Sequence, residues 1–165
     1  AWGTELLEAA RRLQPAGAVY HNMSGADLER ILTHPATVVG SDGLPNDPKP
    51  HPRLWGAFPR VLGYFSRERA LLPLHAAVRK MTGQSAERFG LAERGLVRQG
   101  YWADLVLFNP DTVRDAATFT DPQQPAVGIA AVWVNGQLAY RDGAVQPAHA
   151  GRFLRRGPRN QAAFA

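Results

Sequence analysis

The chain has 165 residues, of which 45% are hydrophobic and 20% charged, and it contains no cysteine. This composition supports a folded core and excludes disulfides, a thiol nucleophile and cysteine-bound zinc within the stretch. The formal net charge is +5, but four arginines follow the last acidic residue, Asp142, so the excess lies in a C-terminal tail. Because nucleic-acid-binding folds carry a basic face across the fold, we expect a solvated or docked tail and no nucleic-acid partner.

Hydrophobic runs are short throughout the chain. None approaches the ~18 residues that a membrane span needs, and no basic segment precedes an apolar leader. We therefore expect no membrane partner and, as a default, a cytoplasmic location.

The N-terminal third predicts helices and short apolar strands in alternation. Residues 2–14 place their apolar side chains on one helical face, with Thr4 as the expected cap. Ser24, with Asp27 three residues later, resembles a capping box that opens a helix over 26–34. Apolar runs at 18–23 and 36–40 flank this helix, so the pattern predicts a βαβ unit with parallel strands.

The next segment changes character. Five prolines lie within residues 43–59, and their density over 43–52 predicts a long, stiff loop. Such loops are often functional. Helical periodicity then returns over 60–68, 73–82 and 85–91, with Gly83 as the expected exit of the second helix and Ser85 as the cap of the third.

From Gly95 onward the period is two. Residues 103–109 predict a strand, and residues 129–143 predict two strands around the hairpin signal Asn135-Gly136. The composition changes near residue 92. We therefore expect helical α/β material over 1–91 and a small antiparallel sheet over 92–165.

Asp42 is the most informative candidate for catalysis. It comes directly after the strand expected over 36–41, and Gly43 and the proline-rich loop follow it. Active sites of barrels and open α/β sheets form at the carboxyl ends of strands, where an aspartate can accept a proton or bind a metal. Asp-Gly also occurs as a simple turn, so capping of that turn is the structural alternative.

Arg53 is the candidate for substrate binding. It lies in His51-Pro52-Arg53, on the loop that leaves the expected strand end. A guanidinium held by neighbouring prolines is suited to a carboxylate ligand. A surface salt bridge with Asp47 is the alternative.

The histidines form no metal-binding motif. His21, His34, His51 and His75 lie far apart in the sequence, without an H-x-H or H-E-x-x-H pattern. The sequence therefore predicts no metal ligand in this chain. His21, at an expected strand end, is interpreted as a hydrogen-bonded structural residue.

Several segments together resemble the C-terminal part of the N-acyl-D-amino-acid deacylases (D-aminoacylases) of the amidohydrolase superfamily. The resemblance covers nearly the whole chain, and its most specific element is GSDGLP…HPRLWG…FPRVLG. Supporting segments are AVRKMTG, GLVRQGYWADLVLFNPDTVRD, VWVNGQLAYRDG and GRFLRR. The ADLVLF…VNG portion is shared by many amidohydrolases and indicates only the superfamily.

This resemblance implies the last strands and helices of a (β/α)8 metal-dependent hydrolase barrel in 1–91 and part of a small β-sandwich domain in 92–165. Asp42 matches the catalytic acid/base that ends the eighth barrel strand, and Arg53 best matches the arginine that binds the substrate carboxylate. The family's zinc ligands match nothing here. Because a barrel alone needs about 250 residues, we expect zinc ligands upstream of this chain and an inactive isolated chain.

The implied activity is hydrolysis of an N-acyl-D-amino acid to a carboxylate and a free D-amino acid, with that small molecule as the partner. In the family mechanism zinc activates a water, Asp42 takes its proton and delivers it to the leaving amine, and Arg53 orients the substrate. The alternatives are a hydantoinase-like cyclic amidohydrolase and a non-catalytic α/β interaction module with a basic tail. Oligomeric state and substrate side chain are left open.

Overall fold

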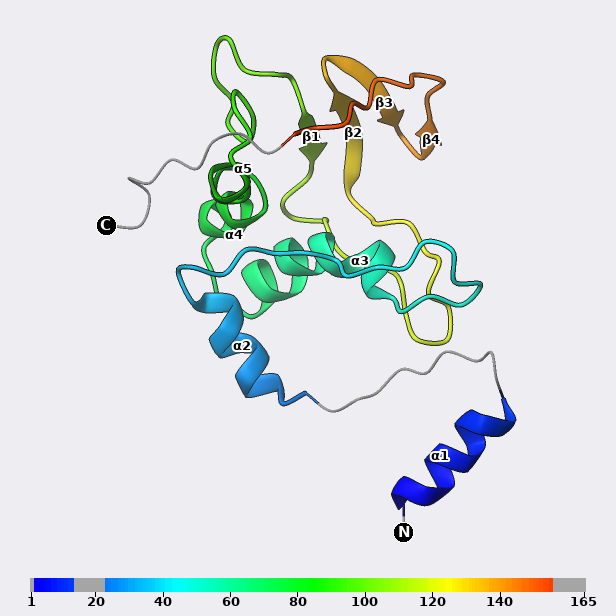
Figure 1. Cartoon of the computed structure of the whole chain (residues 1–165). Helices are drawn as coiled ribbons and strands as arrows, with labels where there is room; N and C mark the ends of the chain where they lie inside the picture. Colours follow the sequence, from blue (N-terminus) through cyan, green and yellow to red (C-terminus); the bar gives the residue numbers. More distant parts are fainter. Residues whose placement is uncertain (1, 14–22, 156–165) are drawn as a thin grey trace.

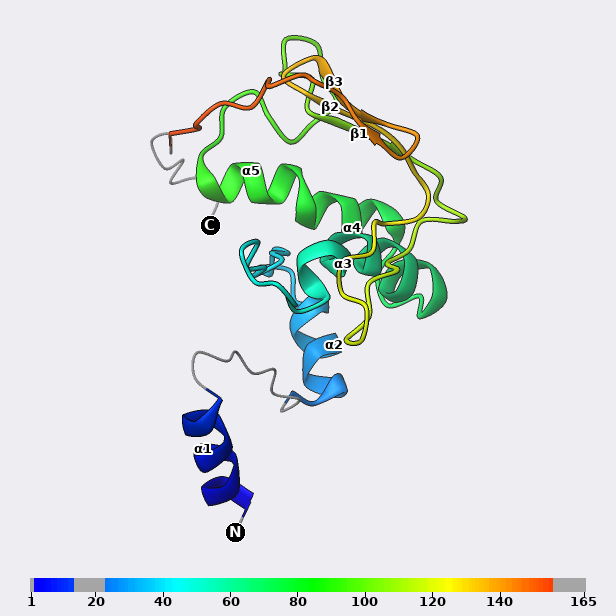
Figure 2. The same ribbon diagram turned by 90° about the vertical axis from the view of Figure 1, so that its right-hand side faces the viewer.

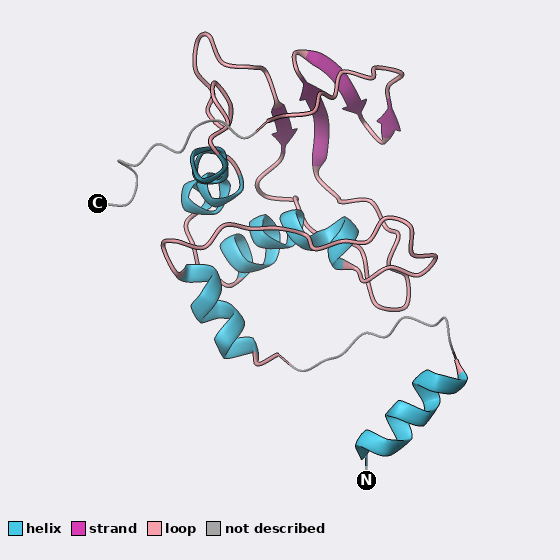
Figure 3. Ribbon diagram, in the orientation of Figure 1, coloured by secondary structure: helices cyan, strands magenta, loops and turns pink. Residues whose placement is uncertain are grey.

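The structure is a computed structural model that describes residues 2–13 and 23–155. Figures 1 and 3 show helices through the first part of the chain and a small sheet in the last part. The helices are α1 (Trp2–Arg12), α2 (Gly25–Thr33), α3 (Arg53–Arg60), the π-helix η1 (Val61–Glu68), α4 (Leu74–Met81) and α5 (Gly83–Phe89). The strands are β1 (Leu105–Phe108), β2 (Ile129–Val134), β3 (Gln137–Arg141) and β4 (Ala144–Val145). No helix in the described ranges is long and apolar enough to cross a membrane.

The predicted helices form, although some of their ends differ from expectation. Ser24 caps α2 as predicted, because its side chain accepts a hydrogen bond from the backbone N–H of Asp27 at 3.5 Å. By contrast, α1 begins upstream of Thr4. Gly83 opens α5 instead of ending α4, and Ser85 lies inside α5, where its hydroxyl donates to the carbonyl of Lys80.

The helical segment predicted at 60–68 is confirmed, but as a π-helix that continues α3 without a break. Pro59 lies just before the change of helix type. Since proline has no N–H, it cannot complete the α-helical hydrogen bond expected at that position. The end of η1 is correspondingly wide, with the N–H of Arg69 donating to the carbonyl of Tyr64.

The sheet confirms the strand and hairpin predicted after residue 92. Its four strands are antiparallel in the order β1-β2-β3-β4, and β2 and β3 turn at Asn135-Gly136. The turn is attached to the segment before β1, because the Asn135 N–H donates to Asp104 Oδ1 at 2.8 Å and the Gly136 N–H to the Ala103 carbonyl at 3.0 Å.

The strand predicted over 36–41 is wrong for this structure. Residues 37–44 carry no regular secondary structure and run as a loop between α2 and α3 (Figure 1). An apolar segment becomes a strand only when a neighbouring strand satisfies its backbone, and no described strand pairs with it. The other strand of the predicted βαβ unit, at 18–23, lies almost entirely outside the described residues.

The hydrophobic core lies between the helices and the end of the sheet where β1 finishes and β2 begins. η1 contributes Val61, Leu62 and Phe65, and Val113, beyond β1, is completely buried. The other buried members are Leu32 of α2, Leu72 just before α4, and Ala77 of α4. Phe108 of β1 and Ile129 of β2 pack against this cluster. In Figures 1 and 2 the sheet lies above α3.

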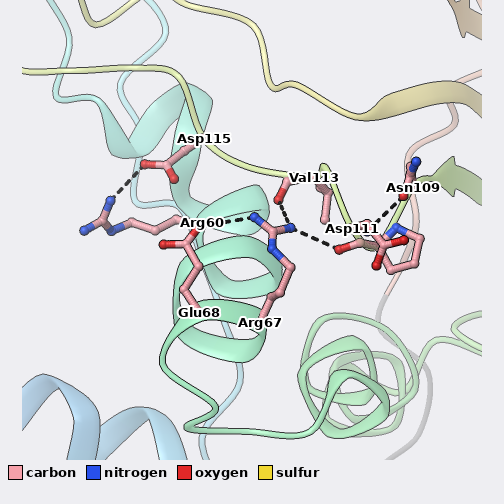
Figure 4. A network of polar contacts seen from close by, with 8 residues as sticks. Arg60, Arg67, Glu68, Asn109, Asp111, Val113 and Asp115 are labelled. Atoms are coloured by element: carbon pink, nitrogen blue, oxygen red, sulfur yellow. Dashed lines mark hydrogen bonds and ion pairs between the residues drawn. The ribbon is translucent and has the colours of Figure 1, made fainter.

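Arg67 of η1 fastens the helices to the chain that follows β1. Its Nη1 donates to the carbonyls of Pro110 at 3.0 Å and Val113 at 2.7 Å. Arg60 adds an ion pair with Asp115 at 3.0 Å (Figure 4). The helical and sheet portions are therefore joined by polar contacts as well as by the apolar core.

The apolar faces of α1 and α2 are more exposed than their periodicity predicts. Leu6 and Leu7 of α1 are 58% and 52% exposed, and Ile31 of α2 is 52% exposed, whereas Leu32 is buried. Amphipathic helices form because the apolar stripe finds a partner surface. The described part of this chain provides such a surface only for Leu32.

One arginine in the described part of the basic tail contacts the sheet portion. The Arg152 guanidinium lies over the Trp102 ring at 5.0 Å, and Arg94 lies over the same ring at 5.1 Å. The Asn135 side chain also donates to the carbonyl of Ala150. A cation–π contact of this kind holds one arginine of the tail against the protein's own surface.

Gly63 marks the closest approach of η1 to the chain beyond β1. A Cβ at this position would lie 2.5 Å from the carbonyl oxygen of Val113 and 3.1 Å from the Cα of Arg114. Since both are backbone atoms in or next to a fully buried residue, Gly63→Ala is expected to lower the free energy of unfolding by about 1–3 kcal/mol through overpacking. Gly25→Ala is the matched control, because a Cβ added to Gly25 in α2 would meet nothing within 4 Å. Denaturant unfolding curves that show equal stability for the two variants would contradict this packing.

Candidate functional site

Asp42 lies at a strained position on the loop between α2 and α3. Its φ angle is 49°, in the left-handed region that residues with a Cβ seldom adopt. The next residue must be small, because a Cβ on Gly43 would overlap the side chain and Cα of Leu54 in α3. Local strain of this kind is common at functional sites.

Arg53 and Asp42 lie together, although eleven residues separate them in the sequence. Arg53 Nη2 contacts Asp42 Oδ2 at 2.8 Å, and Arg53 Nε donates to the Asp42 backbone carbonyl at 2.9 Å. The structure thus pairs Arg53 with Asp42, and the alternative pairing with Asp47 is wrong. Asp47 instead accepts from the backbone N–H of Lys49.

The Asp42 carboxylate is directed to Arg53, and a neighbouring residue caps the turn. The hydroxyl of Ser41 accepts from the N–H of Gly43, two residues later, at 3.4 Å. Within the described residues, Asp42 Oδ1 has no hydrogen-bond donor. The site therefore presents one carboxylate oxygen to solvent and holds the other against a guanidinium.

The paired side chains leave donors and acceptors available for a ligand. A guanidinium has five N–H donors, and Asp42 occupies two of them. Arg53 can therefore keep its contact with Asp42 and still bind a carboxylate through its remaining N–H groups. Asp42 Oδ1 can accept a proton beside that bound carboxylate.

A buried lysine anchors the chain that leads to Asp42. Lys80 of α4 is only 5% exposed, and its ammonium donates to the carbonyls of His34 at 2.6 Å and Thr37 at 3.0 Å. Gln84 adds bonds to the carbonyls of Pro35 and Thr37. These contacts hold the backbone of residues 34–37 against α4 and α5. They thereby fix the position of the first part of the loop that leads to Asp42.

Burial, and secondarily the charge of Arg79, lower the pKa of Lys80 below its usual 10.5. Because the pKa is lower in the folded state than in the unfolded state, the charged lysine lowers the free energy of unfolding. This destabilisation disappears as the lysine deprotonates. The neutral amine keeps two N–H groups for the two carbonyls. The free energy of unfolding of the wild type, minus that of Lys80→Met, should therefore increase with pH through the window below 10.5. Chemical denaturation at several pH values measures this difference, and a difference that decreases with pH would contradict the burial.

No metal centre is found in the described part of the chain. Residues 2–13 and 23–155 contain no group of three histidine, aspartate or glutamate side chains able to hold a metal ion. His34 instead ends α2, where its Nδ1 accepts from the N–H of Ala36. His21 lies outside the described residues. The donor set of the described residues does not fit a metal ion.

The candidate site is open. The Asp42 side chain is 82% exposed and the Arg53 side chain 42% exposed. A pocket of about 470 Å³ lies elsewhere, between η1, the start of α4 and the chain after β1, with Leu62, Leu74 and Pro110 among its lining residues. Catalytic sites normally enclose the substrate and exclude water. The exposed Asp42–Arg53 pair does not by itself enclose a ligand.

Two contributors to the site were missed in the sequence. His51 accepts a hydrogen bond from the Arg53 backbone N–H at 3.0 Å, and Lys80 anchors the preceding loop. The sequence contains a weak signal for Lys80, because it follows the buried Ala77 by three residues on the same helical face. For His51, the one sequence signal is its place two residues before Arg53, next to Pro52.

The comparisons with known proteins identify the class to which this fold and site belong. The model of the Amidohydrolase family matches residues 3–140. This match spans most of the sequence, so the chain belongs to the amidohydrolase family.

Individual relatives within that class act on N-acylated D-amino acids according to their names. The chain is 53% identical over 154 residues to D-aminoacylase of Alcaligenes xylosoxydans xylosoxydans, a match that covers 93% of this chain and 32% of that protein. It is 57% identical over 142 residues to the N-acyl-D-aspartate deacylase of the same organism, covering 84% of this chain and 28% of the relative. The chain thus spans about a third of the length of the relatives it matches.

Solved structures agree with these sequence relatives. A crystal structure of D-aminoacylase superposes with a TM-score of 0.88 at 55% identity, covering 90% of this chain and 31% of that chain. N-acyl-D-glutamate deacylase from Bordetella bronchiseptica, complexed with zinc and a phosphonate inhibitor that mimics the tetrahedral intermediate, superposes at 0.82 with 52% identity, covering 87% and 30%. The described arrangement of helices and sheet is therefore that of the matching third of these enzymes.

Proposed function

We propose that this chain forms the C-terminal part of a zinc-dependent N-acyl-D-amino-acid deacylase. The observation that carries the proposal is the Asp42–Arg53 pair, in which a carboxylate and a guanidinium from separate segments meet at 2.8 Å. Identities of 52–57% to three named deacylases support this activity over a cyclic amidohydrolase and over an interaction module.

Asp42 is proposed as the general acid/base of the hydrolysis. Its Oδ1 takes a proton from the water that attacks the amide carbonyl, and it then delivers this proton to the leaving amine. Cleavage of the C–N bond consumes one water and releases a carboxylate and a D-amino acid. The contact of Oδ2 with Arg53 fixes the carboxylate so that Oδ1 keeps one direction.

Arg53 is proposed to bind the α-carboxylate of the substrate. Its Nε and one Nη2 proton are committed to Asp42, and the outer N–H groups are oriented away from that contact. A substrate held there has its carboxylate and its scissile amide at set positions relative to Asp42. Reversing the configuration at Cα moves the acylamino group away, which is a physical basis for a preference for one enantiomer.

Zinc is part of the proposal, although the residues described here do not form its site. The Bordetella deacylase structure is a complex with zinc, and another D-aminoacylase structure concerns a binuclear metal centre. We infer that the ligands lie in the part of the enzyme that this chain does not match, within the (β/α)8 barrel expected from the resemblance. The isolated chain is accordingly expected to be inactive, and a cytoplasmic location stays a prediction.

A chimera tests the proposed function. In the Alcaligenes D-aminoacylase, the third that matches this chain would be replaced by residues 1–165, and the product loaded with zinc. We expect hydrolysis of N-acyl-D-amino acids that depends on Asp42. A chimera that folds and binds zinc, yet releases no D-amino acid, would contradict the proposal.

A further inference from the structure

The side chain of His51 caps the N-terminus of α3 at Arg53. The N-cap residue of α3 is Pro52, which makes no side-chain cap hydrogen bond. The His51 Nδ1 atom instead accepts from the backbone N–H of Arg53 at 3.0 Å. Because the first N–H groups of a helix have no partner within the helix, the imidazole satisfies a donor that would otherwise depend on water.

The imidazole is also held from its other side. The Phe119 ring meets it edge-to-face, with centroids 5.0 Å apart and an interplanar angle of 79°. The segment around Phe119 is itself closed by mutual hydrogen bonds between Thr118 and Asp121. A ring that both accepts a hydrogen bond and packs against an aromatic edge has a restricted orientation.

This restriction acts on the site through Arg53. The capped N–H belongs to the same residue whose side chain binds the carbonyl of Asp42 at 2.9 Å and its carboxylate at 2.8 Å. The direction of the Arg53 side chain follows from the placement of its backbone at the start of α3. Small displacements of a binding group reduce its contribution to an oriented complex strongly.

We propose that His51 is a positioning residue for Arg53, and that it sets the affinity for the carboxylate of the substrate without contacting the reacting atoms. This inference rests on the proposed function. It predicts that any side chain at position 51 that accepts a hydrogen bond from the Arg53 N–H maintains the affinity for the substrate, whether or not it is an imidazole. Asparagine places Oδ1 where it can accept the N–H two residues later, as Asn109 does for Asp111 in this chain.

The chain contains its own control for the local structure. Asn109-Pro110-Asp111 repeats the arrangement, with Asn109 Oδ1 accepting from the Asp111 N–H at 2.9 Å, and the candidate residues Asp42 and Arg53 are not among its described contacts. Asn109→Leu therefore removes an equivalent hydrogen bond outside the candidate site. Any general effect of losing such a turn should be visible in that variant.

The experiment compares His51→Phe, His51→Asn and Asn109→Leu in the intact enzyme. For an N-acyl-D-amino acid, His51→Phe should increase KM about tenfold, as expected when a charge-assisted contact is displaced, with a smaller change in kcat. His51→Asn should restore KM, and Asn109→Leu should leave it unchanged. For an N-acyl amine without the carboxylate, all three should match the wild type. Equal impairment by His51→Asn and His51→Phe, or no difference between His51→Phe and Asn109→Leu, would overturn the inference.

A second measurement separates this inference from the proposed function. In protein labelled with [15N]arginine, the Arg53 Nε–H signal, assigned by its loss in Arg53→Lys, reports the bond to the Asp42 carbonyl. Its proton should exchange faster with solvent in His51→Phe than in the wild type or His51→Asn. If the wild type does not hydrolyse N-acyl-D-amino acids, the proposed function is wrong, and this exchange rate alone decides whether His51 positions Arg53. Unchanged exchange in His51→Phe would overturn the positioning role.

Discussion

Replacing Asp42 by asparagine in the intact, zinc-loaded enzyme is expected to lower kcat by about 10²–10⁴, the contribution typical of a general acid/base. Asparagine preserves the shape of the side chain and can still accept a hydrogen bond from Arg53, but it cannot take a proton from water. Steady-state hydrolysis of an N-acyl-D-amino acid measures the effect, with KM expected to change far less than kcat.

Asp47→Asn is the matched control, because it makes the same substitution five residues away on the same loop. Asp47 accepts only a local hydrogen bond from Lys49 among the described contacts. Its variant should retain wild-type kcat. Near-normal turnover by Asp42→Asn, with zinc content verified, would reduce Asp42 to a strained turn residue.

Arg53→Lys is expected to raise KM for N-acyl-D-amino acids by the equivalent of roughly 1.5–3 kcal/mol of lost binding, the value of a hydrogen bond to a charged group. Lysine keeps the charge but lacks the planar fork, so it cannot contact both the Asp42 carbonyl and its carboxylate while binding a substrate. For N-acyl amines without the carboxylate, KM should remain nearly unchanged. Kinetics with both kinds of substrate measure the difference.

Arg69→Lys provides the control for loss of an exposed arginine ion pair. Arg69 contacts Glu29 at 2.8 Å, and its side chain is 51% exposed, comparable with the 42% of Arg53. Arg69→Lys should leave KM unchanged for both substrates. In Arg53→Lys, a loss of kcat that comes from a less fixed Asp42 would affect both substrates alike. The ratio of the KM values for the charged and the uncharged substrate therefore decides. Equal KM increases for charged and uncharged substrates would rule out the carboxylate clamp.

Local signals predicted much of the fold. The Ser24 cap of α2 and the hairpin at Asn135-Gly136 both depend on a few neighbouring residues, and the structure confirms both. The strand expected over 36–41 failed because pairing depends on a neighbour that sequence periodicity cannot supply. The exposed faces of α1 and α2 have the same origin, since an amphipathic pattern predicts burial but not the surface that provides it.

The two candidate residues could be selected from the sequence, but their contact could not. Asp42 was chosen at the end of an apolar run and Arg53 on a proline-framed loop, and the structure shows that their side chains meet. Their roles in catalysis and substrate binding stay predictions. The support from Lys80 and His51 depends on contacts with residues 34–37 and with the start of α3. Such contacts are set by tertiary packing, which leaves little trace in the local sequence.

The most direct test of the proposed function is the release of free amino acid by the intact zinc-loaded protein, measured for the two enantiomers of one N-acylated amino acid. We expect the D-enantiomer to be hydrolysed and the L-enantiomer to remain intact, and we expect the isolated 165-residue chain to release nothing from either. Equal turnover of both enantiomers, or no turnover of the D-substrate by correctly folded, zinc-loaded protein, would contradict the proposed function.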